Sequence, residues 1–241
     1  MINDLEKYLI GIALGIRFRA NFSIEDQLGK ITDTILYSKD SFFGPTIFPK
    51  VSAGIVKKLL FNELTQDTLR IDNSNIILEI YFGDDLSFGK GDLSEILNGF
   101  EKQIVQGILK EFSIKEIIRI GYIKRYLFQI NKLANSFVNK TIGDTLQGIN
   151  DINLNFSKKI LLTEALAKKD INDYDNAIFN VIKRSDVDEI FMSVDYQSFF
   201  DPFLPSSMNI EFKSFIDRAN GFNQNKYLPW LNNNYVEVKD E

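Results

Sequence analysis

The stretch Ile10–Phe22, IGIALGIRFRANF, alternates between apolar residues and small or polar ones. The even positions are all apolar: Ile10, Ile12, Leu14, Ile16, Phe18, Ala20 and Phe22. A period of two over this length predicts a long β-strand that buries one face. The next apolar residues fall at helical spacing, at Ile24, Leu28, Ile31 and Ile35, so a helix is predicted over 24–37 with Ser23 as its N-cap.

The sequence predicts further strands and helices up to about residue 130. They are a loop over 38–50, a strand or short helix over 51–64, a hairpin of Thr68–Ile71 and Asn75–Phe82 that turns at Asp72–Ser74, a helix over 93–112 and a strand over 116–128. The resulting order, β-α-β-β-α-β, is that of the split βαβ unit. It predicts a ferredoxin-like antiparallel sheet with both helices on one face.

The remaining residues predict an antiparallel half of order α-β-β-β-α. Its elements are a helix near 131–140, strands at about 151–167, 175–184 and 188–199, and a C-terminal helix near 208–222. Pro202 and Pro205 are expected to end the last strand, and Trp230 to anchor the tail. We therefore predict an α+β protein whose halves, 1–130 and 131–241, form two domains or one fused domain.

The 241 residues include no histidine and no cysteine. A Ser-His-Asp triad, a Cys-His pair, a zinc finger and a redox CxxC motif are therefore excluded. The lack of cysteine also excludes disulfides and is consistent with the cytoplasm. The apolar stretch Leu9–Ile16 is too short to span a membrane and is followed by Arg17 and Arg19, so neither a membrane span nor a signal peptide is expected.

The loop Gly83–Gly91 lies between a predicted strand and a predicted helix, which is where phosphate-binding loops occur. Its glycine spacing is one residue too long, and Gly91 stands where a Ser or Thr should follow Lys90. Two adjacent aspartates, Asp84 and Asp85, would also repel a phosphate. A simple connecting loop is the better interpretation.

Two acidic clusters have a structural and a chemical interpretation. The first consists of Asp170, Asp173 and Asp175. It lacks the central glycine of a calcium-binding loop, so a polar turn is the better interpretation. The second consists of Asp186, Asp188, Glu189 and Asp195. It could supply paired carboxylates for acid–base catalysis, but solvated turn and edge positions are the better interpretation. The sequence therefore predicts no catalytic residue, no metal site and no cofactor.

Arginines provide the one functional clue. In the strand 116–128 the apolar even positions are Ile118, Ile120, Tyr122, Tyr126 and Phe128. Arg119 and Arg125 then face the other side, where Arg17 and Arg19 of the first strand also point. Like charges on neighbouring strands need a partner. Internal pairing, for example with Glu79, is the favoured interpretation, and binding of an anionic ligand or RNA is the alternative. Tyr81 is the only clear aromatic residue expected on this face.

Three short segments carry a resemblance: Arg119–Arg125 (RIGYIKR), Gly15–Phe18 (GIRF) and Val194–Tyr196 (VDY). With them the chain resembles a sporadically distributed family of uncharacterised prokaryotic proteins. Lys124 departs from the more neutral residue expected at its position. The family has no assigned activity, so the resemblance implies no catalytic residue. By analogy it implies an accessory to phage-defence or mobile-element systems. The layout also resembles CRISPR RNA-processing endonucleases, whose catalytic histidine this chain lacks.

Net charge is −5, which disfavours a protein whose main task is to bind nucleic acid. The leading hypothesis from the sequence is a non-catalytic cytoplasmic protein that binds a protein partner or itself. Exposed strand edges offer a route to such association. The alternative hypothesis is an RNA- or nucleotide-binding module that uses Arg17, Arg19, Arg119 and Arg125. A carboxylate-based enzyme is a third, weaker one.

Overall fold

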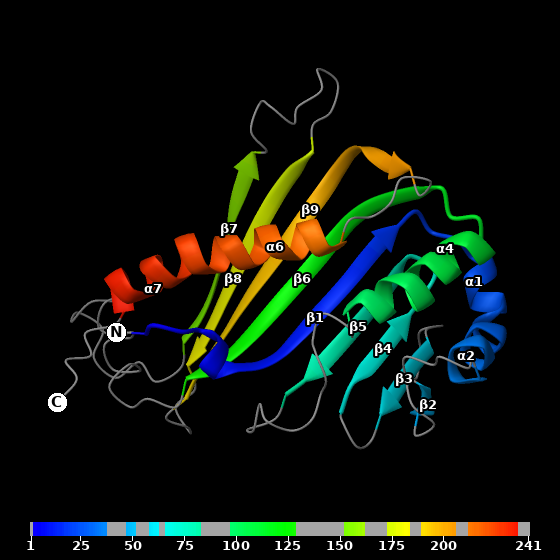
Figure 1. Ribbon diagram of the computed structural model, residues 1–241, viewed down its shortest axis with the longest axis horizontal. Helices are drawn as coiled ribbons and strands as arrows, with labels where there is room; N and C mark the ends of the chain where they lie inside the picture. The colour runs from blue at the N-terminus through cyan, green and yellow to red at the C-terminus, as the bar shows by residue number, and fades with distance from the viewer. Residues whose placement is uncertain are drawn as a thin grey trace.

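The computed structural model describes residues 2–37, 47–51, 58–62, 66–82, 97–128, 152–161, 173–183, 189–205 and 212–235. These residues form an α+β structure with one nine-stranded sheet of order β2-β3-β4-β5-β1-β6-β9-β8-β7. Every neighbouring pair of these strands is antiparallel. The helices lie on one face of the sheet, where α6 and α7 cross the strands β7, β8 and β9 (Figure 1). The other face carries no described helix, and we call it the open face.

The strands are β1 (Leu9–Phe18), β2 (Ile47–Val51), β3 (Lys58–Asn62), β4 (Thr68–Ile71), β5 (Asn75–Tyr81), β6 (Glu116–Phe128), β7 (Ile152–Leu161), β8 (Tyr174–Lys183) and β9 (Ile190–Pro205). The helical elements of the first half are the 3-10 turn η1 (Glu6–Tyr8), α1 (Ser23–Asp26), α2 (Leu28–Tyr37), the π-helical turn η2 (Phe100–Val105) and α4 (Gln106–Glu111), which continues from η2. The C-terminal helix consists of α6 (Phe212–Phe222), the π-helical turn η3 (Asn223–Tyr227) and α7 (Leu228–Tyr235). Among the described residues, no helix combines the length and apolar character needed to cross a membrane.

Strand β1 confirms the predicted alternation over most of its length. Ile12, Leu14, Ile16 and Phe18 are all buried against the helices. The prediction that the strand continues to Phe22 is wrong, because β1 ends at Phe18 and Phe22 is 67% exposed. Beyond Phe18 the ladder gives way to single backbone bonds, from the Arg19 amide to Glu116 and from the Asn21 amide to Asn73 in the β4–β5 turn. At the other end, a bulge between Leu9 and Gly11 turns Leu9 rather than Ile10 to the core.

The helix predicted over 24–37 is present, with its apolar stripe of Ile24, Leu28, Ile31 and Ile35 buried. It is divided at Gln27 into α1 and α2. Ser23 is not the N-cap as predicted, because Phe22 occupies that position. The side chain of Asn21 instead accepts a hydrogen bond from the Ser23 amide at 3.1 Å.

The next segments are strands. The undecided segment 51–64 contains β3, and residues 47–50, predicted as loop, belong to β2. Pro49 is compatible with β2 because this strand lies at the edge of the sheet. The hairpin of Thr68–Ile71 and Asn75–Phe82 is confirmed as β4 and β5, one residue shorter at its end. The loop Gly83–Gly91 and the predicted helix near 131–140 lie outside the described residues.

Strand β6 spans 116–128 as predicted and joins the two halves of the chain, because it pairs with β1 on one side and β9 on the other. A register shift between Ile117 and Arg119 makes Ile117 the buried residue in place of the predicted Ile118. From Arg119 onward, the buried and open faces of β6 alternate as predicted, and one residue not assigned to the core is also buried. Lys124 lies on the core face between Tyr122 and Tyr126 and is 4% exposed.

The last strand and helix are both longer than predicted. Strand β9 continues through Pro202 to Pro205, so Pro202 does not end it. Pairing with β6 skips from Phe199 to Leu204, so the missing amide of Pro202 removes no bond of that ladder. The predicted C-terminal helix does not end at 222 but continues to Tyr235. Its second half stays helical because Tyr227, Leu228 and Leu231 are buried.

Trp230 anchors the tail as expected, because its ring contacts those of Phe156, Phe179 and Tyr227 at centroid distances of 5.5, 6.0 and 5.8 Å.

Two strand glycines differ sharply in the space around them. A Cβ on Gly11 would lie 2.8 Å from the backbone oxygen of Ile80, whereas a Cβ on Gly121 would find its nearest atom at 3.7 Å. We expect Gly11→Ala to lower the free energy of unfolding by about 2 kcal/mol through overpacking. Gly121→Ala should be neutral or stabilising by up to about 1 kcal/mol, because glycine is entropically costly in a strand. Urea unfolding of both variants measures this, and equal losses would contradict the model of a tightly packed β1–β5 pair.

Candidate functional site

The four predicted arginines do not form one cluster. Arg17 of β1 and Arg119 of β6 are direct cross-strand partners on the open face. Arg125 lies on the same face but six residues further along β6, roughly 20 Å away at a rise of ~3.3 Å per residue. Arg19 follows the end of β1. The structure therefore brings together Arg17 and Arg119 and separates them from the other two.

Internal pairing accounts for the separated arginines. Arg125 donates to Glu79 at 2.6 Å, which confirms the internal pairing that the sequence favoured for this residue. Arg19 donates to Glu116 at 3.0 Å, and its side chain is 73% exposed. Exposed pairs of this kind contribute little to stability. Neither arginine is left with an uncompensated charge that requires a ligand.

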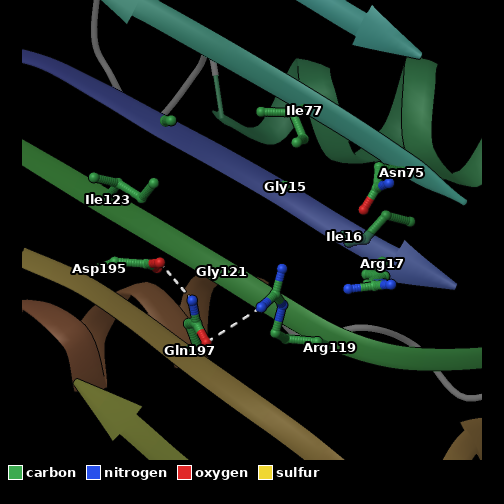
Figure 2. A pocket seen from close by; sticks show the side chains of 11 residues that line it. Gly15, Ile16, Arg17, Asn75, Ile77, Arg119, Gly121, Ile123, Asp195 and Gln197 are labelled. Atoms are coloured by element: carbon green, nitrogen blue, oxygen red, sulfur yellow. Dashed lines mark hydrogen bonds between the residues drawn. The ribbon is translucent and has the colours of Figure 1, made fainter. Parts of the chain in front are cut away.

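Arg17 and Arg119 have fewer partners. Arg119 donates to the side-chain oxygen of Gln197 at 3.4 Å, and Gln197 in turn donates to Asp195 (Figure 2). Burial lowers the pKa of Arg119, the nearby Asp195 carboxylate opposes that shift, and Arg17 adds to it. Arg17 itself is exposed and makes no ion pair with any residue that the structure describes. The pair thus carries more positive charge than its neighbours neutralise.

Asp195, one of the acidic candidates, lies beside this pair rather than in a solvated position. Burial raises its pKa, while the hydrogen bond from Gln197 and the charges of Arg119 and Arg125 lower it. Because its pKa is raised in the folded state, its contribution to stability is greatest in acid and falls as the pH rises through the interval above its ordinary value of 3.8. Asp195 therefore partly neutralises the charge of Arg119 and leaves the charge of Arg17 in place.

A hollow of about 80 Å³ lies next to the arginine pair. Gly15 and Gly121 face each other across β1 and β6 at its floor (Figure 2). The space that a Cβ would fill is open at Gly121 but is occupied by Ile77 at Gly15. Ile77 and Ile123 supply apolar walls, and Asn75 lies at the same end as Arg17. The hollow holds more than one water-sized group, since liquid water occupies ~30 Å³ per molecule.

An aromatic pair continues the line of the two arginines across the sheet. Phe199 of β9 is the cross-strand partner of Arg119, and Tyr174 of β8 is the partner of Phe199. The two rings stack with centroids 4.9 Å apart and planes 10° from parallel. The Arg119 guanidinium lies 5.5 Å from the Phe199 ring centroid, and Lys159 lies 4.0 Å from that of Tyr174.

We call the side chains of this line the open-face row. Its members are Asn75, Arg17, Arg119, Phe199 and Tyr174, on the adjacent strands β5, β1, β6, β9 and β8. The sequence predicted the two arginines but not the aromatic pair, because positions 119, 199 and 174 become neighbours only through strand register. Tyr81, the aromatic residue that was predicted on this face, is 45% exposed and lies further along β5.

The other acidic candidates are placed only in part. Asp170, Asp186 and Asp188 lie outside the described residues. Asp173 accepts the backbone amide of Asp201 at 2.8 Å. Asp175 is not in a solvated turn as predicted; it lies in β8, 1% exposed, and accepts a hydrogen bond from Tyr196 at 2.6 Å. In the portion of the chain that the structure describes, no group of three or more acidic residues is placed to hold a metal ion.

A second hollow lies on the opposite face, among the helices, and the sequence did not predict it. This helix-side cavity has a volume of about 680 Å³. Its polar lining includes Glu6, Glu101, Tyr122, Lys124 and Asn220. Lys124 donates to Glu6 at 2.6 Å, with its side chain only 5% exposed. Burial, with a contribution from Glu6, raises the pKa of Tyr122, so this phenol remains protonated.

Comparison with protein-family models, with curated proteins and with solved structures found no match for this chain. The resemblance to the sporadically distributed prokaryotic family remains a prediction.

Proposed function

We propose that the protein binds single-stranded nucleic acid across its open sheet face. The observation that carries the proposal is the open-face row, in which Arg17, which has no ion pair within the described residues, and its neighbour Arg119 continue directly into the stacked pair Phe199 and Tyr174. Single-strand binding surfaces combine cations that follow the phosphates with aromatic side chains that contact bases. The row places both kinds of group in one line across five strands.

The charge of the open face supports an anionic ligand although the chain has a net charge of −5. In the strands from β4 to β7 in sheet order, the described residues on this face include five basic side chains and three acidic ones, with the pair Arg19–Glu116 cancelling at the strand end. The basic residues are Arg17, Arg70, Arg119, Arg125 and Lys159, and the acidic ones are Glu79, Asp195 and Asp201. A local surplus of two positive charges can therefore attract phosphate despite the acidic average.

The chemistry assigns different roles along the row. The guanidinium groups of Arg17 and Arg119 supply planar sets of donors suited to phosphate oxygens. Asn75 adds an amide beside Arg17 at the end of the hollow, and the open space at Gly121 allows close approach to the backbone. The Phe199–Tyr174 pair offers apolar contact to an unpaired base. A duplex would hide its bases, so a single strand is the preferred form.

We also infer that the first half has the ferredoxin-like arrangement. The order β4-β5-β1-β6 supports it, because in a split βαβ unit the first strand lies between the third and the fourth and is antiparallel to both. The hairpin of β2 and β3 would then be an addition at one edge. This arrangement puts the helices on one face and leaves the other free for the row. The lack of cysteine supports a cytoplasmic location.

Removing both arginines of the row tests the proposal. A fluorescein-labelled RNA of about 12 nucleotides, titrated at several salt concentrations, should bind the wild-type protein. Arg17→Ala with Arg119→Ala should weaken binding about a hundredfold, because two charge-assisted contacts are lost. The slope of log affinity against log salt should fall by about 1.4, which is ~0.7 for each phosphate contact. Asp195→Asn should change affinity in the opposite direction, because it removes the carboxylate beside Arg119.

The matched control is Lys30→Ala with Lys110→Ala, which removes the same charge from exposed positions on the helical elements. This control should bind RNA within about twofold of wild type, since its charges lie more than one Debye length of ~8 Å from the row. Equal losses in both double variants, or no RNA binding by wild type, would contradict the proposal. If instead the arginine variant alone loses self-association in sedimentation, the open face is a protein interface.

A further inference from the structure

The helix-side cavity is a second site that the open-face row does not use. Helix α6 and the helix that contains η2 and α4 lie on the same face of the sheet (Figure 1). The rings of Phe100 and Phe212 meet between these two helices at 6.2 Å, edge to face. Beside this contact the cavity of about 680 Å³ lies above β6. Small-molecule sites commonly enclose ~300–1,000 Å³, so its size fits a small organic ligand.

The charges around the cavity cancel except at one point. Lys124 is paired with Glu6, which neutralises the buried ammonium. Lys213 and Asp217 lie at exposed positions of α6 and are opposite in sign. The remaining ionisable carboxylate is Glu101 of η2, which is half-buried and lines the cavity. Burial raises its pKa, against the influence of the neighbouring Lys102, as expected for an acid with too little compensation.

Asn220 provides a second hydrogen-bond acceptor in the lining. Its side-chain oxygen is buried, and no residue that the structure describes donates to it. A buried acceptor without a donor is unfavourable, so a turn of this amide toward a ligand that donates to it would favour binding. Glu101 and Asn220 together favour a ligand that brings N–H donors and positive charge.

Apart from the exposed Asn98, the rest of the lining is apolar. Leu97, Phe212 and Ile216 come from the two helices, and the ring of Tyr122 comes from β6. These side chains suit a compact hydrocarbon or aromatic body, while the carboxylate and the amide oxygen suit one polar head. A freely hydrated polar metabolite would leave this apolar wall unused.

We propose that the helix-side cavity binds a small organic cation, a protonated amine on an apolar body, with Glu101 and Asn220 accepting from the ammonium group. The apolar body lies against Leu97, Phe212 and Ile216. This proposal does not depend on nucleic-acid binding, because the cavity and the open-face row lie on opposite faces of the sheet.

Three probes with the same phenyl body test the charge preference. They are 2-phenylethylamine, 2-phenylethanol and 3-phenylpropionate, which are cationic, neutral and anionic at neutral pH. Isothermal titration of the full-length protein should show the amine binding at least about tenfold more tightly than the alcohol, and the acid weaker still. Equal affinities, a preference for the acid or no binding of the amine at millimolar concentration would overturn the proposal.

Variants locate the site and guard against a folding artefact. Glu101→Gln should remove the preference for the amine and leave the alcohol unchanged. The matched control is Glu111→Gln, the same change at an exposed position of α4 that pairs with Lys30. It should leave all three affinities unchanged. Ile216→Trp should fill the cavity and weaken amine and alcohol alike. Undiminished amine binding in both Glu101→Gln and Ile216→Trp would place the ligand elsewhere and overturn the assignment.

Discussion

Glu6→Gln is expected to destabilise the protein by about 3 kcal/mol, although Glu6 itself is nearly half exposed. The reason lies in its partner, because the side chain of Lys124 is 5% exposed and Glu6 at 2.6 Å is the carboxylate that it contacts. Removing one partner of a buried pair leaves an uncompensated charge, which typically costs 3–5 kcal/mol, whereas an exposed partner can be hydrated. Urea unfolding with an unchanged m-value measures the loss.

Replacing the other partner of this ion pair should destabilise the protein only slightly. Lys124→Met keeps a long side chain between Tyr122 and Tyr126 and leaves Glu6, whose side chain is 46% exposed, in contact with water. We expect a loss of less than about 1 kcal/mol. In the Lys124→Met background, Glu6→Gln should then have almost no effect, which a double-mutant cycle would show as a coupling of about 2–3 kcal/mol. Equal losses in the two single variants would contradict the assignment of the penalty to a buried ammonium.

Asp175→Ala is expected to cost about 3–5 kcal/mol, because it removes the acceptor at the centre of a buried network. The Asp175 carboxylate accepts hydrogen bonds from Tyr196, from Ser198 and from Arg218 at 3.3 Å. Arg218 also donates to the Ser198 hydroxyl at 3.2 Å, so the network joins α6 to β8 and β9. Loss of the carboxylate would leave the Tyr196 hydroxyl buried without its partner.

Two further variants define the origin of that loss. Asp175→Asn keeps the shape of the side chain and should cost about 1–3 kcal/mol, because one oxygen becomes a donor and the charge opposite Arg218 is lost. Asp173→Ala, two residues earlier, removes only the exposed acceptor of the Asp201 amide and should cost less than about 1 kcal/mol. Thermal unfolding ranks the three variants. A loss for Asp175→Ala no larger than that for Asp173→Ala would show that the network does not hold α6 to the sheet.

The periodicity of the sequence was sufficient to predict most elements. The alternation in 10–18 defined β1, and the helical stripe at Ile24–Ile35 was buried as expected. The helix predicted over 93–112 is present as η2 and α4 where the structure describes it. Prediction failed at the ends and at bulges. The bulge near Leu9 and the register shift after Ile117 each moved a residue to the other face, which no local pattern indicates, because a one-residue shift in a strand exchanges its faces.

The candidate sites depended on tertiary structure to a greater degree. The sequence predicted that Arg17, Arg119 and Arg125 share a face, yet it could not show that Arg125 has Glu79 as a partner while Arg17 has no ion pair in the described chain. Lys124 stood out as an unusual residue in an apolar strand, but Glu6, the group that neutralises it, is 118 residues away. The helix-side cavity forms where a helix from each half meets the sheet.

By itself, the sequence determined the α+β class, the buried faces of β1 and β6 over most of their length and the absence of histidine and cysteine chemistry, because these follow from local periodicity and composition. Only the tertiary structure decided the neighbours of each side chain. Arg119, Phe199 and Tyr174 form a row because antiparallel register aligns β6, β9 and β8, and register is set by packing over the entire sheet rather than by any single segment.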